Sequence, residues 1–426
     1  MKRNSHLVRI AAVAAASTLV LAACGSDDSG DTPKGDEPTT KGDGTLTIGT
    51  LLPETGNLAF LGPPEFAGVD LAIKDINEAG GVLGKDVVTV RGDSGDTDNA
   101  IAPAESDKLI KAGSDVIVGA ASSGVSLTVI DKIMSAGVVM YSPANTSTAF
   151  DEGDFAEPDL YFRDAPSDIL QGAVLSNLLV KDGRQNVAIL ARQDAYGQVL
   201  AAEVQKNLEA AGSTVAANEL YDEKNGPSDT QISAVANAKP DAVVLIAFDE
   251  TTSIVPKLVK AGAGPQAIPT YFVDGNTASY AADSATPLPA GTLEGTKGTI
   301  PGAEAKGDFK KNLLEVDPSL KTFTYSAESY DAVVTSALAA IAAGDDSGES
   351  IASKLPSVTE GGEKCTTFAD CAALLRDDKN ADIDYDGVSG PIDLGPTGSP
   401  TAASIGIYEY DADNNYNAVE FIAGNI

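Results

Sequence analysis

Two short loops rich in hydroxyl groups are the parts of this 426-residue chain best suited to hold a small anion. Residues 119–124 follow an apolar strand predicted at 116–118 and open a predicted helix, and residues 142–147 follow the apolar run 138–141. A glycine- and serine-rich loop that opens a helix presents free backbone N–H groups, which favour an anion. Loops at the carboxyl ends of parallel strands form a ligand crevice, so the two loops could hold one carboxylate.

Alternating strand and helix patterns surround these loops. Apolar runs typical of strands, such as 46–51, 187–190 and 242–247, alternate with segments whose apolar residues have helical spacing. Repeated strand–helix units indicate parallel sheets covered on both faces. The units are too many for one domain, so we predict an α/β fold with two doubly wound lobes, and we expect residues 344–398 to form a less regular elaboration.

Composition and charge exclude several functions. The formal net charge is −33, which argues against nucleic acid and against an anionic membrane surface as partners of the folded part. The only histidine is His6, so Ser-His-Asp catalysis, Cys-His catalysis and histidine metal sites are not expected in the mature chain. Paired carboxylates could still cleave glycosides, but no such pair is marked. We therefore predict no enzyme activity, no metal and no cofactor.

The N-terminus has the pattern of an export signal. Basic residues at Lys2, Arg3 and Arg9 precede an uncharged run at 10–23 that is too short to span a membrane. The run ends in small residues before Cys24, which resembles a bacterial lipobox. We expect residues 1–23 to be a lipoprotein signal peptide and residues 24–44 to be the lipidated Cys24 and a flexible linker. The alternative is an ordinary signal peptide with a chance cysteine.

Two further cysteines, Cys365 and Cys371, lie close together in the sequence. An exported compartment is oxidising, so we expect a disulfide between them, while two thiols without a histidine make a poor metal site. The acidic run 382–393 has some of the spacing of a calcium loop, but Pro391 disfavours the helix that would follow such a loop. We therefore do not expect a calcium site there, and we leave calcium binding as an alternative.

Several sequence blocks together resemble one family. They are residues 46–56 and 66–81, the serines at 122–123 after a strand, and the blocks 142–143, 195–197 and 330–333. They resemble the branched-chain amino acid (Leu/Ile/Val-type) solute-binding proteins of ABC importers, nearly from residue 45 to the C-terminus. The resemblance implies a periplasmic-binding-protein type I fold, in which a three-crossover hinge joins two lobes that close on a ligand. It places lobe 1 at 45–164 plus 296–395 and lobe 2 at 165–295 plus 396–426.

The resemblance also implies individual ligand contacts. Ser123 and Thr146 match positions that bind the ligand carboxylate, and Asp274 falls where an acid commonly binds the ammonium group. A backbone contact is implied at Ala144 or Asn145, and aromatic residues that cover the ligand at Tyr196 and Phe248. The complete predicted set is Phe60, Leu61, Ser122, Ser123, Ala144, Asn145, Thr146, Tyr196, Phe248 and Asp274.

Each predicted contact also has a purely structural alternative. Ser122 and Ser123 are good helix N-caps whatever the ligand, and Thr146 and Asp274 could be turn residues. Tyr196 and Phe248 could belong to the core of a lobe.

The predicted contacts suit a zwitterion. Hydroxyl and N–H donors satisfy a carboxylate, and a buried Asp274 would reject ligands that lack an amine, because its charge would stay unpaired. We therefore predict a monomeric, extracytoplasmic receptor, held on the outer face of the bacterial membrane only by its lipid. It would capture a branched-chain or other neutral amino acid and deliver it to an ABC permease. The alternatives are a ligand sensor of the same fold and an importer receptor for an amide, urea or aromatic acid.

Overall fold

The computed structural model describes residues 41–152, 155 and 159–425. The expected signal peptide, Cys24 and nearly all of the expected linker lie outside the described residues, so these assignments stay predictions from the sequence. In the part that is described, no helix is both long enough and apolar enough to cross a membrane.

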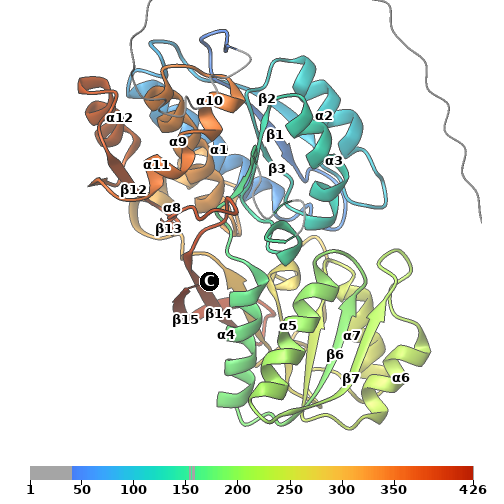
Figure 1. The fold of residues 1–426 in the computed structure, drawn as a ribbon. Helices are drawn as coiled ribbons and strands as arrows, with labels where there is room; N and C mark the ends of the chain where they lie inside the picture. The colour runs from blue at the N-terminus through green and yellow to red at the C-terminus, as the bar shows by residue number, and fades with distance from the viewer. Residues whose placement is uncertain (1–40, 153–154, 156–158, 426) are drawn as a thin grey trace, which may run out of the picture. The chain divides into compact units, whose positions relative to one another are not determined.

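Five parallel strands form the first sheet, in the order β2-β1-β3-β4-β5 (Figure 1). The strands and their covering helices are β1 (Thr47–Leu52), α1 (Gly62–Glu78), β2 (Val88–Asp93), α2 (Ala102–Lys111), β3 (Val116–Gly119), α3 (Ser123–Ser135), β4 (Val139–Ser142), β5 (Tyr161–Arg163) and α9 (Ser326–Ala343). Successive strand residues point to opposite faces. Ile48 and Val118 therefore pack with α1 and α9, whereas Leu51 and Ile117 pack with α2 and α3.

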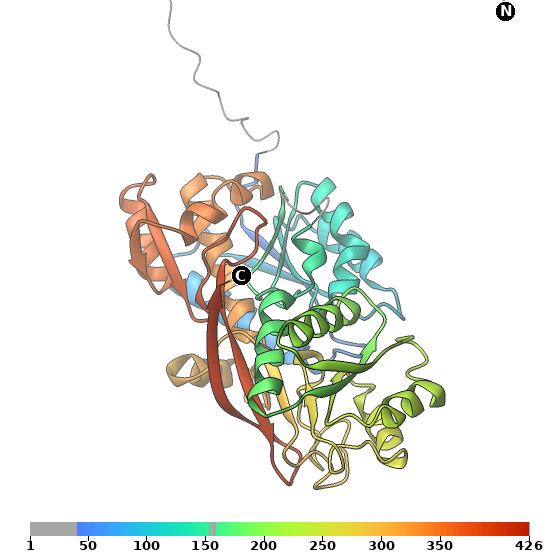
Figure 2. The same cartoon turned by 60° about the horizontal axis from the view of Figure 1, so that its bottom comes forward.

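Seven strands form the second sheet, in the order β15-β14-β10-β9-β8-β6-β7. Its elements are α4 (Asp168–Lys181), β6 (Asn186–Arg192), α5 (Gly197–Ala210), β7 (Thr214–Tyr221), α6 (Asp229–Asn237), β8 (Ala242–Ile246), α7 (Thr251–Lys260), β9 (Thr270–Phe272), β10 (Lys297–Pro301), β14 (Ala402–Tyr410) and β15 (Tyr416–Asn425). Ile189 and Val244 pack with α4 and α5, and Leu190 and Val243 with α6 and α7. Figure 2 shows the antiparallel β14–β15 hairpin beside α4. Two mainly parallel sheets, each covered on both faces, confirm the predicted fold class.

The remaining elements form an elaboration with a small third sheet, β11-β12-β13. They are α8 (Gly307–Val316), α10 (Gly348–Ala352), α11 (Leu355–Thr359), β11 (Glu363–Cys365), α12 (Phe368–Asp377), β12 (Ile383–Gly387) and β13 (Gly390–Pro391). Cys365 and Cys371 form the expected disulfide. The acidic run becomes β12 and β13, and Lys364 pairs with Asp384 at 3.0 Å and with Asp386 at 2.9 Å.

Most predicted strands lie close to their expected bounds, but several elements were not predicted. They include α6, α8, β10 and β15. We expected the first lobe to resume at residue 296, yet β10 pairs with β9 and β14 in the second sheet. The chain therefore leaves the second sheet only after Pro301.

Three connections join the two large sheets. The first runs from β5 to α4 (164–167), the second from β10 to α8 (302–306), and the third from β13 to β14 (392–401). We call the first sheet, its helices and the small sheet the first lobe, and the second sheet with its helices the second lobe.

Arg163, at the end of β5, ties the first and third connections together. Its side chain is fully buried. The guanidinium donates to Ser399 Oγ at 2.8 Å and to the carbonyl oxygens of Asn145 at 3.0 Å and Ser147 at 2.9 Å. It also pairs with Asp151 at 2.5 Å. One buried cation thus holds the loop after β4 and a residue of the third connection in place.

Arg163→Met should therefore be strongly destabilising. The change removes the only cation that pairs with Asp151 within the described residues and removes a donor from two buried carbonyl groups, so we expect a loss of about 3 kcal/mol in the free energy of unfolding. Urea unfolding measures this loss. Lys321→Met is the control, because the Lys321–Asp283 pair is well exposed and should contribute less than about 1 kcal/mol. Equal effects of the two substitutions would contradict the role given to Arg163.

Candidate functional site

A pocket between the two lobes gathers most of the residues predicted to bind ligand. It is lined by Leu58, Leu61, Ala121, Ser122, Ser123, Ala144, Thr146, Tyr196, Phe248, Asp274, Gly275 and Tyr325. The cavity measures only about 10 Å³, because side chains of the two lobes meet across it. That volume has room for about one water molecule.

Two of the predicted residues do not line this pocket. Asn145 is fully buried, and its amide donates to the carbonyl oxygens of Ala120 and Ala121 at 3.0 Å each. Asn145 therefore fixes the shape of the loops through its side chain. Phe60 lines a separate cavity of 470 Å³ with Tyr280 and other residues, because the turn before α1 directs Leu58 and Leu61, but not Phe60, to the pocket.

The two hydroxyl-rich loops of the first lobe are bonded to one another. Ser142 Oγ donates to the carbonyl oxygen of Ala120 at 2.7 Å, and Ser123 Oγ accepts from the N–H of Ser147 at 3.4 Å. Ser122 is the N-cap of α3, and its Oγ accepts from the N–H of Val125 at 3.4 Å. Ser122 thus caps the helix, which is the structural role that we gave as the alternative to a ligand contact. The loops still place the positive end of α3 beside the pocket.

Asp274 lies on the opposite wall, in the turn η3 (Asp274–Asn276) that follows β9. Its carboxylate accepts from the hydroxyl of Tyr196 at 2.6 Å, from the amide of Gln171 at 2.9 Å and from the hydroxyl of Tyr325 at 2.7 Å. Tyr196 and Gln171 belong to the second lobe, whereas Tyr325 is the N-cap of α9 in the first lobe. One buried carboxylate therefore bonds to side chains of both lobes.

A second acid, Asp168, adjoins this site and was not predicted. It is fully buried in the first turn of α4, and its N–H donates to the carbonyl oxygen of Thr146 at 2.7 Å. Within the described residues neither carboxyl oxygen of Asp168 accepts a well-formed hydrogen bond, although the Thr146 hydroxyl lies beside the carboxyl group. Burial first, and Asp274 second, raise the pKa of Asp168 well above its usual range.

Gln171, three residues further along α4, was also missed. Its Nε2 serves Asp274, but its Oε1 has no donor within the described residues. In the sequence, Ser167 and Asp168 look like an ordinary helix start, and Gln171 looks like a surface residue of that helix. Nothing in the sequence marks either residue as part of the site, because Arg163, five positions before Asp168, looks like a partner for the acid but forms its ion pair with Asp151.

Aromatic rings form the apolar wall of the pocket. Tyr196 and Phe248 stack with their centroids 5.6 Å apart, and the guanidinium of Arg192 lies 3.5 Å from the Phe248 ring. Gly275 permits this arrangement, because a Cβ atom there would lie 2.6 Å from the Phe248 ring. The two rings line the pocket together with Leu58 and Leu61.

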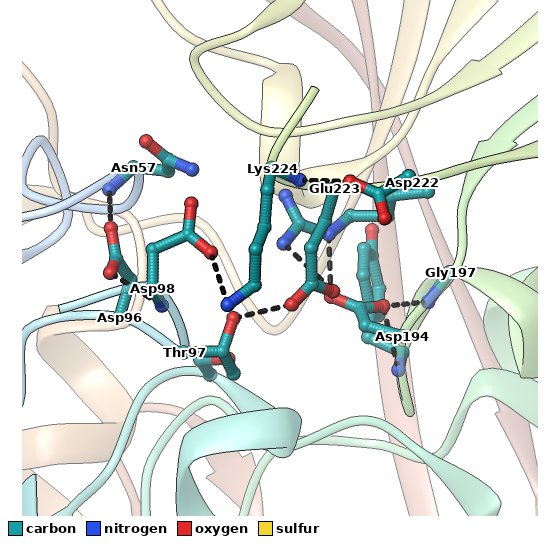
Figure 3. Close-up of polar contacts among 12 residues, drawn as sticks. Asn57, Asp96, Thr97, Asp98, Asp194, Gly197, Asp222, Glu223 and Lys224 are labelled. Atoms are coloured by element: carbon teal, nitrogen blue, oxygen red, sulfur yellow. Dashed lines mark hydrogen bonds and ion pairs between the residues drawn. The ribbon is translucent and has the colours of Figure 1, made fainter. Parts of the chain in front are cut away.

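Polar contacts also join the lobes at the edge of the pocket (Figure 3). Thr97 Oγ1 donates to Glu223 Oε1 at 2.7 Å, and Lys224 lies 3.4 Å from Asp98. We call these four residues the latch. Glu223 also lies 3.8 Å from Arg192, the residue stacked on Phe248, so the latch is connected to the pocket wall.

The fold and the site define a class of protein. Two α/β lobes, three connections and a small polar pocket between the lobes describe a two-lobed solute-binding protein. Residues 45–412 match the family model described as Periplasmic binding protein, and the chain belongs to this family of binding receptors, which are not enzymes.

Sequence relatives are a chemotaxis protein and amino acid-binding proteins. The chain is 26% identical over 367 residues to BasB of Halobacterium salinarum, a substrate-binding protein of a chemotactic signal transduction system; the match covers 82% of this chain and 83% of BasB. It is 29% identical over 206 residues to the Leu/Ile/Val-binding protein BraC3 of Rhizobium johnstonii, covering 48% of this chain and 54% of BraC3.

Solved structures share the fold. The branched-chain amino acid transporter substrate-binding protein LivJ of Streptococcus pneumoniae, in complex with isoleucine, superposes with a TM-score of 0.70 at 19% identity, covering 90% of this chain and 100% of LivJ. A solute-binding protein of an ABC transporter from R. palustris, in complex with benzoate, superposes with a TM-score of 0.67 at 16% identity. The match covers 90% of this chain and 98% of that protein.

The raised pKa of Asp168 has a consequence for stability. The folded protein keeps a proton on Asp168 over a pH range in which the unfolded chain has lost it, so this group lowers stability as the pH rises. Asp168→Asn should therefore raise the Tm at about pH 7.5 by roughly 2 °C or more, and by less at about pH 4.5.

Thermal unfolding of the wild type and the variant at the two pH values measures this difference. Asp182→Asn is a matched control, because Asp182 pairs with Lys297 at 2.7 Å and its replacement should lower the Tm. A lower Tm of Asp168→Asn at the higher pH would show that Asp168 is a stabilising charge.

Proposed function

We propose that this protein is an extracytoplasmic receptor that captures an amino acid with a neutral side chain and delivers it to the permease of an ABC importer. The observation that carries the proposal is the excess of buried acceptors at one end of the pocket. Asp274 lines the pocket, Asp168 and Gln171 adjoin Asp274, and within the described residues no lysine or arginine forms an ion pair with either acid.

An ammonium group supplies what this end of the pocket lacks. It carries a positive charge and three N–H donors, which can bond to carboxylates and to an amide oxygen. A buried carboxylate without a cation or enough donors is costly, so the pair Asp168 and Asp274 should favour an amine over a neutral or anionic group. The ammonium would take the place of a tyrosine hydroxyl at Asp274.

The other end of the pocket suits the carboxylate of the same ligand. Ser123 offers a hydroxyl group there, and the first turn of α3 offers free N–H groups and the positive end of a helix dipole. Thr146 also lines the pocket, and its hydroxyl, which lies beside Asp168, could donate to the same carboxylate. The wall between the two ends is made of Leu58, Leu61 and Phe248, which suit an uncharged side chain. These features together favour a zwitterion with a neutral side chain.

Binding requires the lobes to move. A cavity of about 10 Å³ cannot hold an amino acid, so the ligand would enter an open form and would be enclosed as the lobes turn about the three connections. The ligand then stabilises the closed form by bonding to both lobes, which shifts the equilibrium between the two forms.

Attachment and delivery rest on the sequence. The lipobox-like end of the signal at Cys24 supports a lipid anchor on the outer face of the membrane. The family and the likeness to amino acid-binding relatives support a role with a permease. We propose that the protein acts as a monomer.

A sensor of the same fold is the second candidate, favoured by the match to BasB over 82% of the chain. A receptor for an aromatic acid is a weaker one. The benzoate-bound structure shares the fold only, and the buried acid Asp274 in the pocket, with Asp168 beside it, opposes an anion that has no amine. Transport of the bound solute in cells, measured with the gene deleted and restored, separates an importer from a sensor.

A thermal-shift screen of the twenty amino acids, with benzoate, urea and amides alongside, tests the ligand class. We expect at least one neutral amino acid to raise the Tm, and Asp274→Asn to weaken its binding by about 100-fold, since the ammonium loses a charged partner. Asp283→Asn, at an exposed acid of the second lobe, should leave binding unchanged. Stabilisation by benzoate alone would contradict the ammonium assignment.

The latch should control how fast the ligand leaves. Thr97→Val keeps the side-chain shape but removes the donor to Glu223, which should cost the closed form about 1 kcal/mol and speed dissociation about fivefold. Stopped-flow release of the best ligand measures the rate. Thr230→Val, at an exposed position of α6, is the control. An unchanged rate would show that the latch does not contribute to closure.

A further inference from the structure

Three buried carboxyl groups meet the three connections between the lobes. Asp164 is part of the first connection. Glu328 packs against Gly302 of the second, where a Cβ atom would lie 2.1 Å from the carboxyl oxygen. Asp331 accepts from the N–H groups of Val388 at 3.2 Å and Ser389 at 2.7 Å, just before β13 and the third connection. We call Asp164, Glu328 and Asp331 the hinge triad.

A cavity lies among the same connections. It measures 340 Å³ and is bounded by Asp164 and Pro166, by Gly302 and Ala303, by 389–391 and 402–404, and by Glu328. Asp164 is 6% exposed and Glu328 is 2% exposed, so both are almost entirely buried although they line the cavity. Both oxygens of Asp164 lack a donor within the described residues.

The members of the hinge triad differ in how they are satisfied. Asp331 accepts from the side chains of Tyr385 and Ser389 as well as from backbone N–H groups. These donors offset part of the cost of its burial, which still raises its pKa to about 6. Asp164 has no comparable donors. Throughout the described ranges, no salt bridge connects any of the three to a lysine or arginine.

The surrounding titratable and charged groups do not supply the missing compensation. Glu65, in the first turn of α1, is itself buried, has no donor to either carboxyl oxygen within the described residues, and repels Glu328. Several other groups face the triad. Tyrosines face it from four strands and from α9: Tyr141, Tyr161, Tyr385 and Tyr408 from β4, β5, β12 and β14, and Tyr325 and Tyr330 at α9. Glu304 of the second connection, Lys310 and Lys321 line a neighbouring cavity with Glu328.

We propose that the hinge triad is a proton-binding site that takes up a proton as the lobes close. This inference rests on the closure described above. Turning the lobes apart about the three connections changes the cavity walls and admits water to Asp164 and Glu328. Water stabilises the charged carboxylates, so the open form releases the proton that the closed form holds.

The electrostatics agree with this geometry. Burial first, and the neighbouring acids second, raise the pKa of Asp164 well above its usual range. Burial, with repulsion from Asp331, raises the pKa of Glu328 to about 8. Below this pH the closed form keeps its proton; above it, closing the lobes must bury a charge. Ligand affinity should therefore fall as the pH rises through this range.

Calorimetric titration with the best amino acid from the screen, from about pH 6.5 to pH 9.5, tests the proposal. We expect the ligand affinity of the wild type to fall by up to about tenfold per pH unit above about pH 8. The ligand affinity of Glu328→Gln should change much less over the same range. The ligand ammonium also titrates in this pH range, but it does so equally with both proteins. The ratio of the two affinities therefore reports only the contribution of the triad to the pH dependence. Glu209→Gln, at an exposed acid of α5 that is not among the groups facing the triad, should behave like the wild type. Equal pH profiles of the wild type and Glu328→Gln would overturn the proposal.

Two measurements on the wild type need no variant. Calorimetry at about pH 8, in buffers of different ionisation enthalpy, should show uptake of part of a proton on binding, and release or no transfer would overturn the proposal. If no amino acid binds, the proposed function fails separately. The radius of gyration, measured by small-angle X-ray scattering, then tests the hinge alone: it should increase reversibly between about pH 6 and pH 9.5, and a constant value would count against the triad.

Discussion

The burial of carboxylates without cationic partners is the constraint on which the arrangement of the two lobes depends. Asp274 can lie at the interface because hydroxyl and amide donors reach it from both sides. Asp168 lies beside it with almost no compensation. A protein interior makes such groups costly, so their presence in a pocket indicates that a donor-rich cation belongs there more strongly than any single hydroxyl-rich loop does.

Some acids accept from a tyrosine and also pair with a cation, as Asp182 does with Lys297 and Glu250 does with Arg192. Other acids accept from a tyrosine hydroxyl and form no ion pair within the described residues: Tyr325 donates to Asp274, Tyr385 to Asp331 and Tyr330 to Asp75. A tyrosine donates one proton without neutralising the charge, and its ring still packs in the core. The acids therefore remain sensitive to a further cation or a proton, which a salt bridge would have supplied permanently.

Apolar periodicity and loops after strands predicted the fold class and the two hydroxyl-rich loops, because they are local features. The individual residues Ser123, Thr146, Tyr196 and Asp274 came from the resemblance to solute-binding proteins, and all four line the pocket. Asp168 was missed because its role depends on a neighbour more than a hundred positions away, and alone it looks like the first residue of an ordinary helix. Residues 297–301 were assigned to the wrong lobe, because only the pairing of this unpredicted strand with β9 and β14 shows which sheet it joins.

The acids of the ligand pocket and of the hinge are linked by a single short segment. Asp164, at its start, lines the cavity among the connections, and Asp168, four residues later, adjoins Thr146 and Asp274. Pro166 between them restricts the backbone. A change in the water around Asp164 therefore cannot occur without some movement at the start of α4, where the ligand ammonium would bind. The same segment gives closure, ligand binding and protonation a common structural path, so their free energies should be coupled.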